Sequence, residues 1–425
     1  MDLRLYKSKI SLLGFKGLSI TGSKSETNRL LLLQALYPNL TLQNISNAED
    51  SQVMIQALRA KDSTIDVHHA GTTMRFLTAY FAIQEGREVI LTGSSRMKER
   101  PIKILVDALR QLGAEISYQE NEGFPPLKIT GKKLTKNAVT LPANVSSQYI
   151  SALLLIAPKL ENGLELTLNG PITSVPYIQM TLGLLNEIGI PTTFVGNKIS
   201  VYHKSQIPNP KFQIIESDWS SASYYYSIIA LSEIGSQITL SNYKQNSLQG
   251  DSALIEIYKT FGVDTFFNSN TSIIVSKAEN FVLPTSYIEF NLNNTPDMAQ
   301  TIAVTCFGLG IDCHLTGLHT LKIKETDRLQ ALQNELQKLG AEVTITNDSL
   351  TLQSAVKPIE NITIKTYQDH RMAMAFATLA TKVPIIIEDA EVVSKSYPSF
   401  WEDLKQVGFS FAPFGSSSGQ ISEAN

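Results

Sequence analysis

The feature that most constrains the fold is a unit of one helix, one glycine and two strands that recurs along the chain. Each predicted helix ends at a glycine, and two short segments of alternating apolar and polar residues follow it. One such unit runs from VDALRQLG into AEISYQENEGFPPLKITG. The stop glycines lie 68 to 78 residues apart, at Gly113, Gly189, Gly262, Gly340 and Gly408. Single αβ loops often end in glycine anyway, but five units at similar spacing predict an internal repeat.

The length of this repeat predicts two domains. A chain of 425 residues has room for five or six such units. One core of this type does not hold that many, so we expect an α/β (α+β) protein with about three copies in each of two domains. The segment 415–425, GSSSGQISEAN, is small and polar, and we expect it to be a disordered tail.

Composition excludes several classes of protein. The chain is 43% hydrophobic and 18% charged, and its net charge of −3 gives no attraction for nucleic acid. No run approaches the ~18 apolar residues of a membrane span, and MDLRLYKSKI lacks the apolar region of a signal peptide. The two cysteines, Cys306 and Cys313, and the six histidines show no metal-ligand spacing. We therefore expect a cytoplasmic protein with no metal site, no nucleic-acid partner and no membrane contact.

Several predicted helices start on glycine or hydroxyl residues: Ser23, Gly71-Thr72, Ser146-Ser147, Ser174, Ser220-Ser221 and Thr295. These residue types cap helices by themselves, and Glu26 follows Ser23 at the spacing of a capping box. Basic residues near several of these starts favour a second interpretation. A helix built for stability alone brings acids to its N-terminus, so bases there indicate that an external anion is bound.

Eight cations stand at predicted strand–helix junctions: Lys24, Arg29, Arg75, Arg100, Lys324, Arg328, Arg371 and Lys395. Because the whole chain carries −3, the remaining residues carry −11. If the eight side chains converge, they form a positive pocket in an acidic shell, which attracts small molecules with several negative charges. Two phosphorylated carboxylates would roughly balance these cations once the acids of the site are included.

At this point the motifs resemble a known family, the 3-phosphoshikimate 1-carboxyvinyltransferases or EPSP synthases. The segments that carry the resemblance, in their usual order, are GSKSETNR, AGTTMR, RMKERPIKILVDALRQLGAE, EGFPPL, SSQYISALL, VPYIQMTL, SDWSSASYY, LQGD, TPDMAQTIAV, KETDRL, DHRMAMAF and VSKSYPSFW. They span about residues 22–401. The resemblance implies a two-domain inside-out α/β barrel of six βαβαββ-like repeats. It places residues 22–215 in one domain, and residues 1–21 with 216–425 in the other.

The resemblance also implies a reaction of the shikimate pathway, on the route to the aromatic amino acids. The enolpyruvyl group of phosphoenolpyruvate joins the 5-hydroxyl of shikimate-3-phosphate, and phosphate is released without a metal or organic cofactor. By the same resemblance the catalytic groups are Asp297, Glu325 and Lys24. Shikimate-3-phosphate would contact Lys24, Ser25, Arg29, Ser146, Ser147, Gln148, Ser174, Tyr177, Asp297 and Lys324. Phosphoenolpyruvate would contact Lys24, Gly71, Arg100, Gln148, Arg328, Arg371 and Lys395. A monomer is expected.

In the KETDR segment, Lys324 and Arg328 would face the bound anions while Glu325 delivers a proton to the methylene carbon. Asp327 is interpreted as a structural acid and Thr326 as a helix cap. Which of Glu325 and Lys24 moves which proton stays open. The chain departs from the common family pattern at His69 and Phe76, next to AGTTMR, and this leaves the affinity for phosphoenolpyruvate and for glyphosate open.

Two alternatives remain. The UDP-N-acetylglucosamine enolpyruvyl transferases share the architecture and chemistry but use a cysteine general acid on a mobile loop. Here Cys306 lies inside a predicted helix and Cys313 in a predicted strand, and KETDR with DHRMAM favours shikimate-3-phosphate. The second alternative is a non-catalytic relative that kept the fold, which retention of Asp297, Glu325, Lys24 and Lys395 disfavours.

Overall fold

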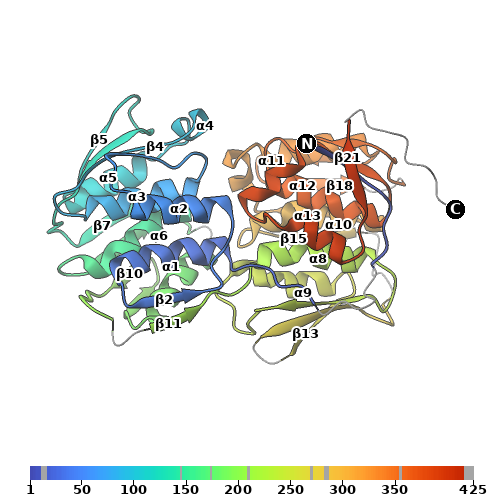
Figure 1. Ribbon diagram of the computed structural model, residues 1–425, viewed down its shortest axis with the longest axis horizontal. Coiled ribbons are helices and arrows are strands. Elements are labelled where there is room, and N and C mark those ends of the chain that lie inside the picture. Colours follow the sequence, from blue (N-terminus) through green and yellow to red (C-terminus); the bar gives the residue numbers. More distant parts are fainter. Residues whose placement is uncertain are drawn as a thin grey trace. The chain divides into compact units, whose positions relative to one another are not determined.

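The computed structural model describes residues 1–10, 17–143, 146–172, 175–207, 211–268, 271–281, 287–353 and 357–415. The chain divides into two compact units (Figure 1). The N-terminal unit comprises Thr21–Asp218 and Tyr243–Ser252. The C-terminal unit comprises Met1–Ile20, Trp219–Asn242 and Ala253–Asn425. The predicted division, 22–215 against 1–21 with 216–425, assigns Thr21, residues 216–218 and the segment Tyr243–Ser252 to the C-terminal domain, whereas all of them belong to the N-terminal unit. This segment packs with the N-terminal unit because Gln249 donates to the carbonyl of Ser217 (2.9 Å) and Ser247 donates to the carboxylate of Glu216 (2.6 Å).

The N-terminal unit contains three described sheets and the helices that they enclose. Its strands are β2 (Leu40–Gln43), β3 (Thr64–Asp66), β4 (Glu88–Thr92), β5 (Glu115–Tyr118), β6 (Leu127–Thr130), β7 (Ala138–Pro142), β8 (Leu164–Asn169), β9 (Thr192–Val195), β10 (Lys198–Val201) and β11 (Lys211–Ile214). Its helices are α1 (Lys24–Leu36), α2 (Glu49–Arg59), α3 (Gly71–Ala82), α4 (Ser95–Lys98), α5 (Lys103–Leu112), α6 (Ser147–Ile156), the 3-10 helix η1 (Ala157–Lys159) and α7 (Val175–Glu187).

The C-terminal unit also contains three described sheets. Its strands are β1 (Asp2–Leu5), β12 (Gln237–Ser241), β13 (Val263–Asn268), β14 (Ser272–Lys277), β15 (Tyr287–Asn291), β16 (Asp312–Thr316), β17 (Glu342–Ile345), β18 (Leu350–Gln353), β19 (Thr363–Ile364), β20 (Ile385–Ile387) and β21 (Phe411–Phe414). Its helices are α8 (Trp219–Leu231), α9 (Leu254–Lys259), α10 (Ala299–Leu309), α11 (Arg328–Lys338), α12 (His370–Ala377) and α13 (Phe400–Gln406). The 3-10 helices are η3 (Pro296–Met298), η4 (His319–Ile323), η5 (Thr378–Thr381) and η6 (Ala390–Lys395), and η2 (Gly250–Ala253) lies at the boundary with the other unit.

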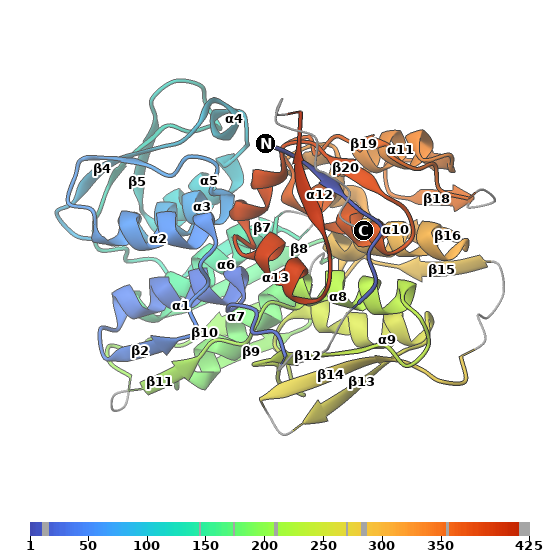
Figure 2. The ribbon, with the colours of Figure 1, turned by 45° about the vertical axis from the view of Figure 1, so that its right-hand side comes forward.

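The predicted repeat is confirmed in the sheet topology. The sheets β3-β4-β6-β5, β7-β8-β10-β9 and β15-β16-β18-β17 share one order, in which a parallel pair is followed by two antiparallel neighbours. The sheet β19-β20-β1-β21 has the same pattern, and β1 from the start of the chain lies beside β21 (Figure 2). All five stop glycines have left-handed backbones, with φ between +72° and +107°. Glycine adopts this conformation without a steric penalty, which is why the helix stops could be predicted locally.

Burial shows that helices lie inside each unit and sheets outside. Strands such as β7 alternate exposed and buried residues, so one face is solvated. Helices α3, α6, α8 and α10 are buried on nearly all sides, and α3 packs against α6 while α8 packs against α10. This arrangement is the predicted inside-out α/β architecture. No helix in the described ranges is long and apolar enough to span a membrane.

Ser23 occupies the predicted N-cap position of α1, but the capping box predicted with Glu26 does not form, and the cap predicted at Thr326 is wrong. Ser23 stands at the N-cap of α1 without a side-chain cap hydrogen bond, and Glu26 turns away from it toward residues 216 and 249. At α11 the cap is Asp327, whose carboxylate accepts from the backbone N–H of Gln330 (3.1 Å), and not Thr326. Both errors arise because several residues in each segment can cap a helix, and tertiary contacts select among them.

Candidate active site

In the N-terminal unit, the start of α1 brings Lys24 to Asp50. The Lys24 ammonium lies 3.3 Å from the carboxylate of Asp50, the second residue of α2, and both side chains are partly buried. Ser25 follows Lys24, and its backbone carbonyl accepts a hydrogen bond from Arg29 (2.8 Å). The basic residue predicted at this helix start therefore has an acid beside it, which keeps the ammonium paired until an anion competes for it.

Arg29 is buried, and its guanidinium joins three helices. It donates to the Thr181 hydroxyl (2.8 Å), the Ser151 hydroxyl (3.0 Å) and the backbone carbonyl of Tyr177 (3.4 Å). The ring of Phe76 lies against it, 5.4 Å from guanidinium carbon to ring centroid. Burial lowers the pKa of Arg29 to about 10. Arg29 therefore has a structural task between α1, α6 and α7, besides the ligand contact predicted for it.

The start of α3 supports Arg100. A Cβ at Gly71 would lie 2.6 Å from Nη1 of Arg100, so a larger residue there would displace this guanidinium. Arg75, one turn into α3, donates to the carbonyls of Gly71 (3.1 Å) and Pro101 (3.2 Å). The hydroxyl of Tyr149 donates to the same Pro101 carbonyl (2.5 Å). Burial, and then the charge of Arg100, lower the pKa of Arg75 to about 10. Arg75 thus links the start of α3 to Pro101, the residue that follows Arg100.

Helix α6 carries the next group of predicted residues. The Ser146 hydroxyl caps α6 by accepting from the N–H of Gln148, Ser147 is the first helical residue, and the Gln148 amide donates to the Thr72 hydroxyl on α3 (3.2 Å). Tyr177 lies in the first turn of α7 and is partly buried. Ser174, which the sequence also predicts as a ligand contact, lies outside the described residues.

The two departures from the family pattern lie in different surroundings. His69 is exposed just before α3, and its Nδ1 is 2.9 Å from the Ser94 hydroxyl that caps α4. Phe76 is fully buried in the interior of α3 beneath Arg29. Phe76 is therefore a core residue of a helix rather than a loop residue, and it reaches the predicted site through Arg29.

In the C-terminal unit, Asp297 is surrounded by three cations. Its carboxylate lies 2.9 Å from Nη1 of Arg328, 3.2 Å from Nη2 of Arg371 and 3.3 Å from the Lys324 ammonium. Asp297 lies in η3, ahead of α10, while Lys324 and Arg328 border the start of α11. Burial by itself would raise the pKa of Asp297, but the charges of Lys324, Arg371 and Arg328 outweigh it and hold that pKa well below the usual range.

Arg328 is the central cation of this cluster, with 2% of its side chain exposed. Besides Asp297, it donates to Asp369 (2.6 Å) and to Glu325 (2.8 Å). Burial alone would lower the pKa of Arg328, but the carboxylates of Asp369, Glu325 and Asp297 raise it above its ordinary value. Arg328 therefore stays protonated, and it orients the predicted base and the predicted acid from one guanidinium.

The start of α12 supplies Arg371, and η6 supplies Lys395. Asp369 caps this helix by accepting from the N–H of Arg371 (2.8 Å), and Arg371 also donates to the Ser220 hydroxyl (3.2 Å). The Lys395 ammonium donates to the backbone carbonyl of Gln368 (2.8 Å). Lys324, Glu325, Arg328, Arg371 and Asp297 are thus brought together in one hydrogen-bonded cluster, and Lys395 lies against the segment that precedes Arg371.

Sequence reasoning missed the acids that orient these cations. Asp50 and Asp369 were given no role, although Asp369 stands beside Arg371 in DHRMAM. A buried carboxylate at a helix start beside a basic residue is the signal that could have found Asp369. No such signal marks Asp50, because its pairing with Lys24 depends on the packing of α2 against α1. Within the described ranges, no group of three or more His, Cys, Asp or Glu side chains is placed to hold a metal ion.

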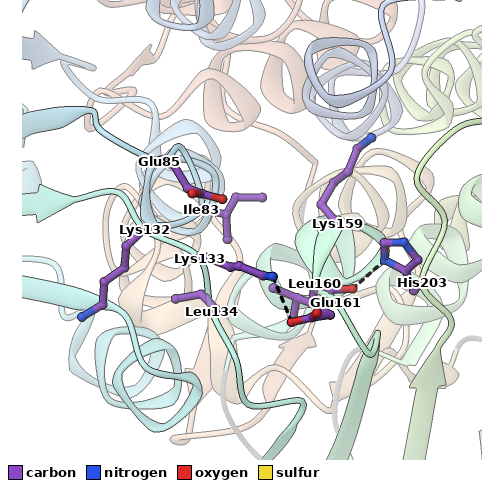
Figure 3. Close-up of a pocket in the computed structure, with 9 residues that line it drawn as sticks. All are labelled: Ile83, Glu85, Lys132, Lys133, Leu134, Lys159, Leu160, Glu161 and His203. Carbon is purple, nitrogen blue, oxygen red and sulfur yellow. Dashed lines mark hydrogen bonds and ion pairs between the residues drawn. The ribbon is translucent and has the colours of Figure 1, made fainter.

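Figure 3 shows a recess in the N-terminal unit that is lined by other residues than these. Its lining includes no predicted site residue, and several of its charged side chains are partnered. Lys133 pairs with Glu161 (3.1 Å), and Lys159 donates to the Ser205 carbonyl (2.8 Å). We assign no ligand to this recess.

Comparisons with known proteins identify the family of the chain. A family model described as EPSP synthase (3-phosphoshikimate 1-carboxyvinyltransferase) matches residues 60–404. The chain is 45% identical over 396 residues to a 3-phosphoshikimate 1-carboxyvinyltransferase of Bacteroides fragilis, covering 92% of this chain and 95% of the relative. It is 34% identical over 417 residues to the Colwellia psychrerythraea protein of the same name, covering 91% and 96%.

Solved structures show the same fold. An EPSP synthase from Acinetobacter baumannii matches with a TM-score of 0.78 at 22% identity, covering 97% of this chain and 100% of that chain. The enolpyruvyl transferase NikO from Streptomyces tendae matches with a TM-score of 0.71 at 12% identity, covering 97% and 99%. At these identities the structures support the fold alone, whereas the family model and the curated relatives support membership. The chain therefore belongs to the EPSP synthase family, the 3-phosphoshikimate 1-carboxyvinyltransferases.

Proposed function

We propose that this protein transfers the enolpyruvyl group of phosphoenolpyruvate to the 5-hydroxyl of shikimate-3-phosphate, releasing phosphate and forming 5-enolpyruvylshikimate-3-phosphate. The observation that carries the proposal is the cluster around Asp297, where one carboxylate is held among Lys324, Arg328 and Arg371. Such a group can accept a hydroxyl proton while its cations bind phosphate or carboxylate oxygens. Family membership supports the same reaction.

In this proposal Asp297 is the general base. It takes the proton of the 5-hydroxyl as that oxygen attacks C2 of phosphoenolpyruvate, and C3 gains a proton in the addition step. C3 then loses a proton as phosphate leaves, which restores the enolpyruvyl double bond. Glu325 and Lys24 are the groups proposed to serve C3. Glu325 is oriented for this by Arg328, whose Nη2 lies 2.8 Å from its carboxylate.

The lowered pKa of Asp297 makes it a weak base in the free protein, because the neighbouring cations stabilise its ionised form. Anionic substrates would supply the compensation. Once phosphate and carboxylate groups pair with Lys324, Arg328 and Arg371, less positive charge acts on Asp297 and its basicity rises. Asp297 would therefore be a stronger base when substrates are bound than in the free enzyme. This difference limits unproductive proton transfer when the site is empty.

The remaining proposed substrate contacts come mainly from residues at the starts of other helices. Shikimate-3-phosphate would be held by residues at the starts of α1, α6 and α7, with Lys324 and Asp297. Phosphoenolpyruvate would be held by Lys24, Gly71, Arg100, Gln148, Arg328, Arg371 and Lys395. We further propose that the protein works in the cytoplasm as a monomer.

The competing acceptor, UDP-N-acetylglucosamine, is disfavoured by the cysteines. That chemistry uses a cysteine general acid on a mobile loop, whereas Cys306 lies in α10, Cys313 lies in β16, and both are fully buried. The test is phosphate release from phosphoenolpyruvate with each acceptor in turn. Release with shikimate-3-phosphate alone supports the proposal. Release with UDP-N-acetylglucosamine alone would replace it, and release with neither would favour a non-catalytic relative.

A further inference from the structure

The segment ahead of α12 has an unusual backbone. Tyr367 and Gln368 both have φ of +55°, in the left-handed region that non-glycine residues seldom adopt. Two such residues in succession cost free energy, so the surrounding structure must hold them in place. They directly precede Asp369, which caps α12 and binds Arg328, and the carbonyl of Gln368 accepts from Lys395. The geometry of this turn therefore affects three cations of the proposed site.

Helix α11 holds this turn at two points. At its start, Arg328 binds Asp369 (2.6 Å). Seven residues later, which is about two turns along the same face, lies Glu335, a fully buried carboxylate. Glu335 accepts from the Tyr367 hydroxyl (2.6 Å) and from the backbone N–H of Lys365 (3.0 Å). Helix α11 thus contacts the chain on both sides of the left-handed residues, at Lys365 and at Asp369.

Glu335 makes contacts outside α11 that an ion pair within this helix would not need. An ion pair between residues three apart on a helix, as between Glu335 and Lys338 (2.8 Å), does not need the carboxylate to be buried. Here the carboxylate points away from solvent and receives two further donors from residues 365 and 367. The Tyr367 hydroxyl in turn accepts from the Asn334 amide (3.3 Å). Burial, and then hydrogen bonding to Glu335, raise the pKa of Tyr367 to about 12, so its hydroxyl remains a donor.

We propose that Glu335 and Tyr367 are positioning residues, which hold the left-handed turn at 367–368. This turn places Asp369, Arg371 and the Gln368 carbonyl, which accepts from Lys395, in the geometry needed to bind phosphoenolpyruvate. Neither side chain touches the reacting atoms in this proposal. The expected effect on phosphoenolpyruvate binding rests on the proposed function. The claim that Glu335 and Tyr367 stabilise the turn does not.

The test uses Tyr367→Phe and Glu335→Gln, with Tyr118→Phe as the matched control. The Tyr118 hydroxyl is also buried but has no hydrogen-bond partner among the described residues. For Tyr367→Phe we expect KM for phosphoenolpyruvate to rise roughly tenfold, which corresponds to one lost hydrogen bond to a charged group. KM for shikimate-3-phosphate should stay within about twofold of the wild-type value. Because both changes act on the hydrogen bond between the Tyr367 hydroxyl and Glu335, their effects on KM should be less than additive in the double variant.

Amide hydrogen exchange tests the turn without relying on catalysis. The peptide that covers residues 366–372 should exchange faster in Tyr367→Phe than in the wild-type protein or in Tyr118→Phe. Unchanged exchange in this peptide would overturn the holding of the turn. Faster exchange with an unchanged KM for phosphoenolpyruvate, or with equal rises in both KM values, would overturn the positioning role. If wild-type protein releases no phosphate, the proposed function fails, and the exchange result still decides whether Glu335 and Tyr367 hold the turn.

Discussion

Asp297 has two roles to separate: its charge compensates the neighbouring cations, and it is the proposed general base. It lies at a good helix start, after Thr295 and Pro296, and such a position would explain an acid without any catalysis. Its carboxylate, however, contacts Arg328, Lys324 and Arg371. Removing the charge therefore leaves three cations without compensation, and it also removes the proposed proton acceptor.

Asp297→Asn separates these roles. As general base, Asp297 should contribute ~10²–10⁴-fold to turnover, so the amide should be nearly inactive. Loss of compensation should also lower the melting temperature, and inorganic phosphate should restore part of it by pairing with the freed cations. Melting temperature, shikimate-3-phosphate binding and turnover are measured on one preparation. Turnover near that of the wild type in folded, ligand-binding protein would leave Asp297 with the structural role only.

Substitution of Gly71 tests whether the close approach of α3 to Arg100 matters for substrate binding. An added Cβ would lie 2.6 Å from Nη1 and 2.9 Å from Nη2 of Arg100, so the guanidinium must shift. Alanine favours helices over glycine by up to ~1 kcal/mol, so Gly71→Ala should not lower the melting temperature. We expect KM for phosphoenolpyruvate to rise about tenfold, with little change for shikimate-3-phosphate. Gly183→Ala is the control, since its Cβ would meet Leu248 at a similar 2.7 Å. Equal effects of the two substitutions would contradict this assignment.

At the residue scale, sequence reasoning found cations better than their partners. Lys24, Arg328 and Arg371 stand out because bases at helix starts oppose the helix dipole, and this is a local signal. The partners Asp50 and Asp369 give no comparable signal, because their pairing is set by how separate helices pack. For the same reason the sequence did not show that Arg29 is buried among three helices.

At the scale of single elements, helix ends were predicted well and helix starts less well. A glycine in the left-handed conformation ends a helix through its own backbone, so all five stops could be read locally. At the start of α1 the capping residues had competing partners. Glu26 accepts instead from the Gln249 amide (3.1 Å) and from the N–H of Glu216 (3.3 Å). The first turn of α1 is thus fixed to segments about 190 and 223 residues away.

Glu26 also makes stability depend on pH. Burial, and then the charge of Glu216, raise the pKa of Glu26 from its ordinary 4.5 to about 8. Between these values the folded protein keeps a proton that the unfolded chain has lost, so this contribution to stability is full below about 4.5 and is lost as pH rises toward about 8. The total change is on the order of a few kcal/mol.

Glu26→Gln should remove this pH dependence. An amide mimics the protonated carboxyl but does not titrate, so the melting temperature should fall less between about pH 5 and pH 8 than it does in the wild type. Calorimetry across this range measures the slope, which is independent of any constant offset caused by the substitution. Glu165→Gln, at an exposed position of β8, is the control and should keep the wild-type slope. A Glu26→Gln slope equal to that of the wild type would show that Glu26 does not titrate in this range.

At the scale of the whole molecule, the proposed ligand residues are shared between the two units. Lys24, Ser25 and Arg29 belong to the N-terminal unit, and Lys324 and Asp297 belong to the C-terminal unit. Each unit has its own sheets and core, which is what the repeat predicted, but neither contains all the residues that are proposed to bind substrate. One ligand that engages both sets would stabilise both units, whereas independent anion sites would each stabilise one.

Amide hydrogen exchange with shikimate-3-phosphate distinguishes these cases. In wild-type protein the ligand should slow exchange at short times in α1 of the N-terminal unit and also in η3 and α10 of the C-terminal unit. Strands β13 and β14, which carry no proposed ligand residue, should change little and serve as the internal control. The decisive sample is Lys24→Met. Because coupling through one ligand is reciprocal, loss of a single contact in α1 should weaken protection in both units together at a fixed ligand concentration. Protection that disappears from α1 but persists in η3 and α10 would mean that the two units bind anions separately, and the proposed joint binding of shikimate-3-phosphate would be wrong.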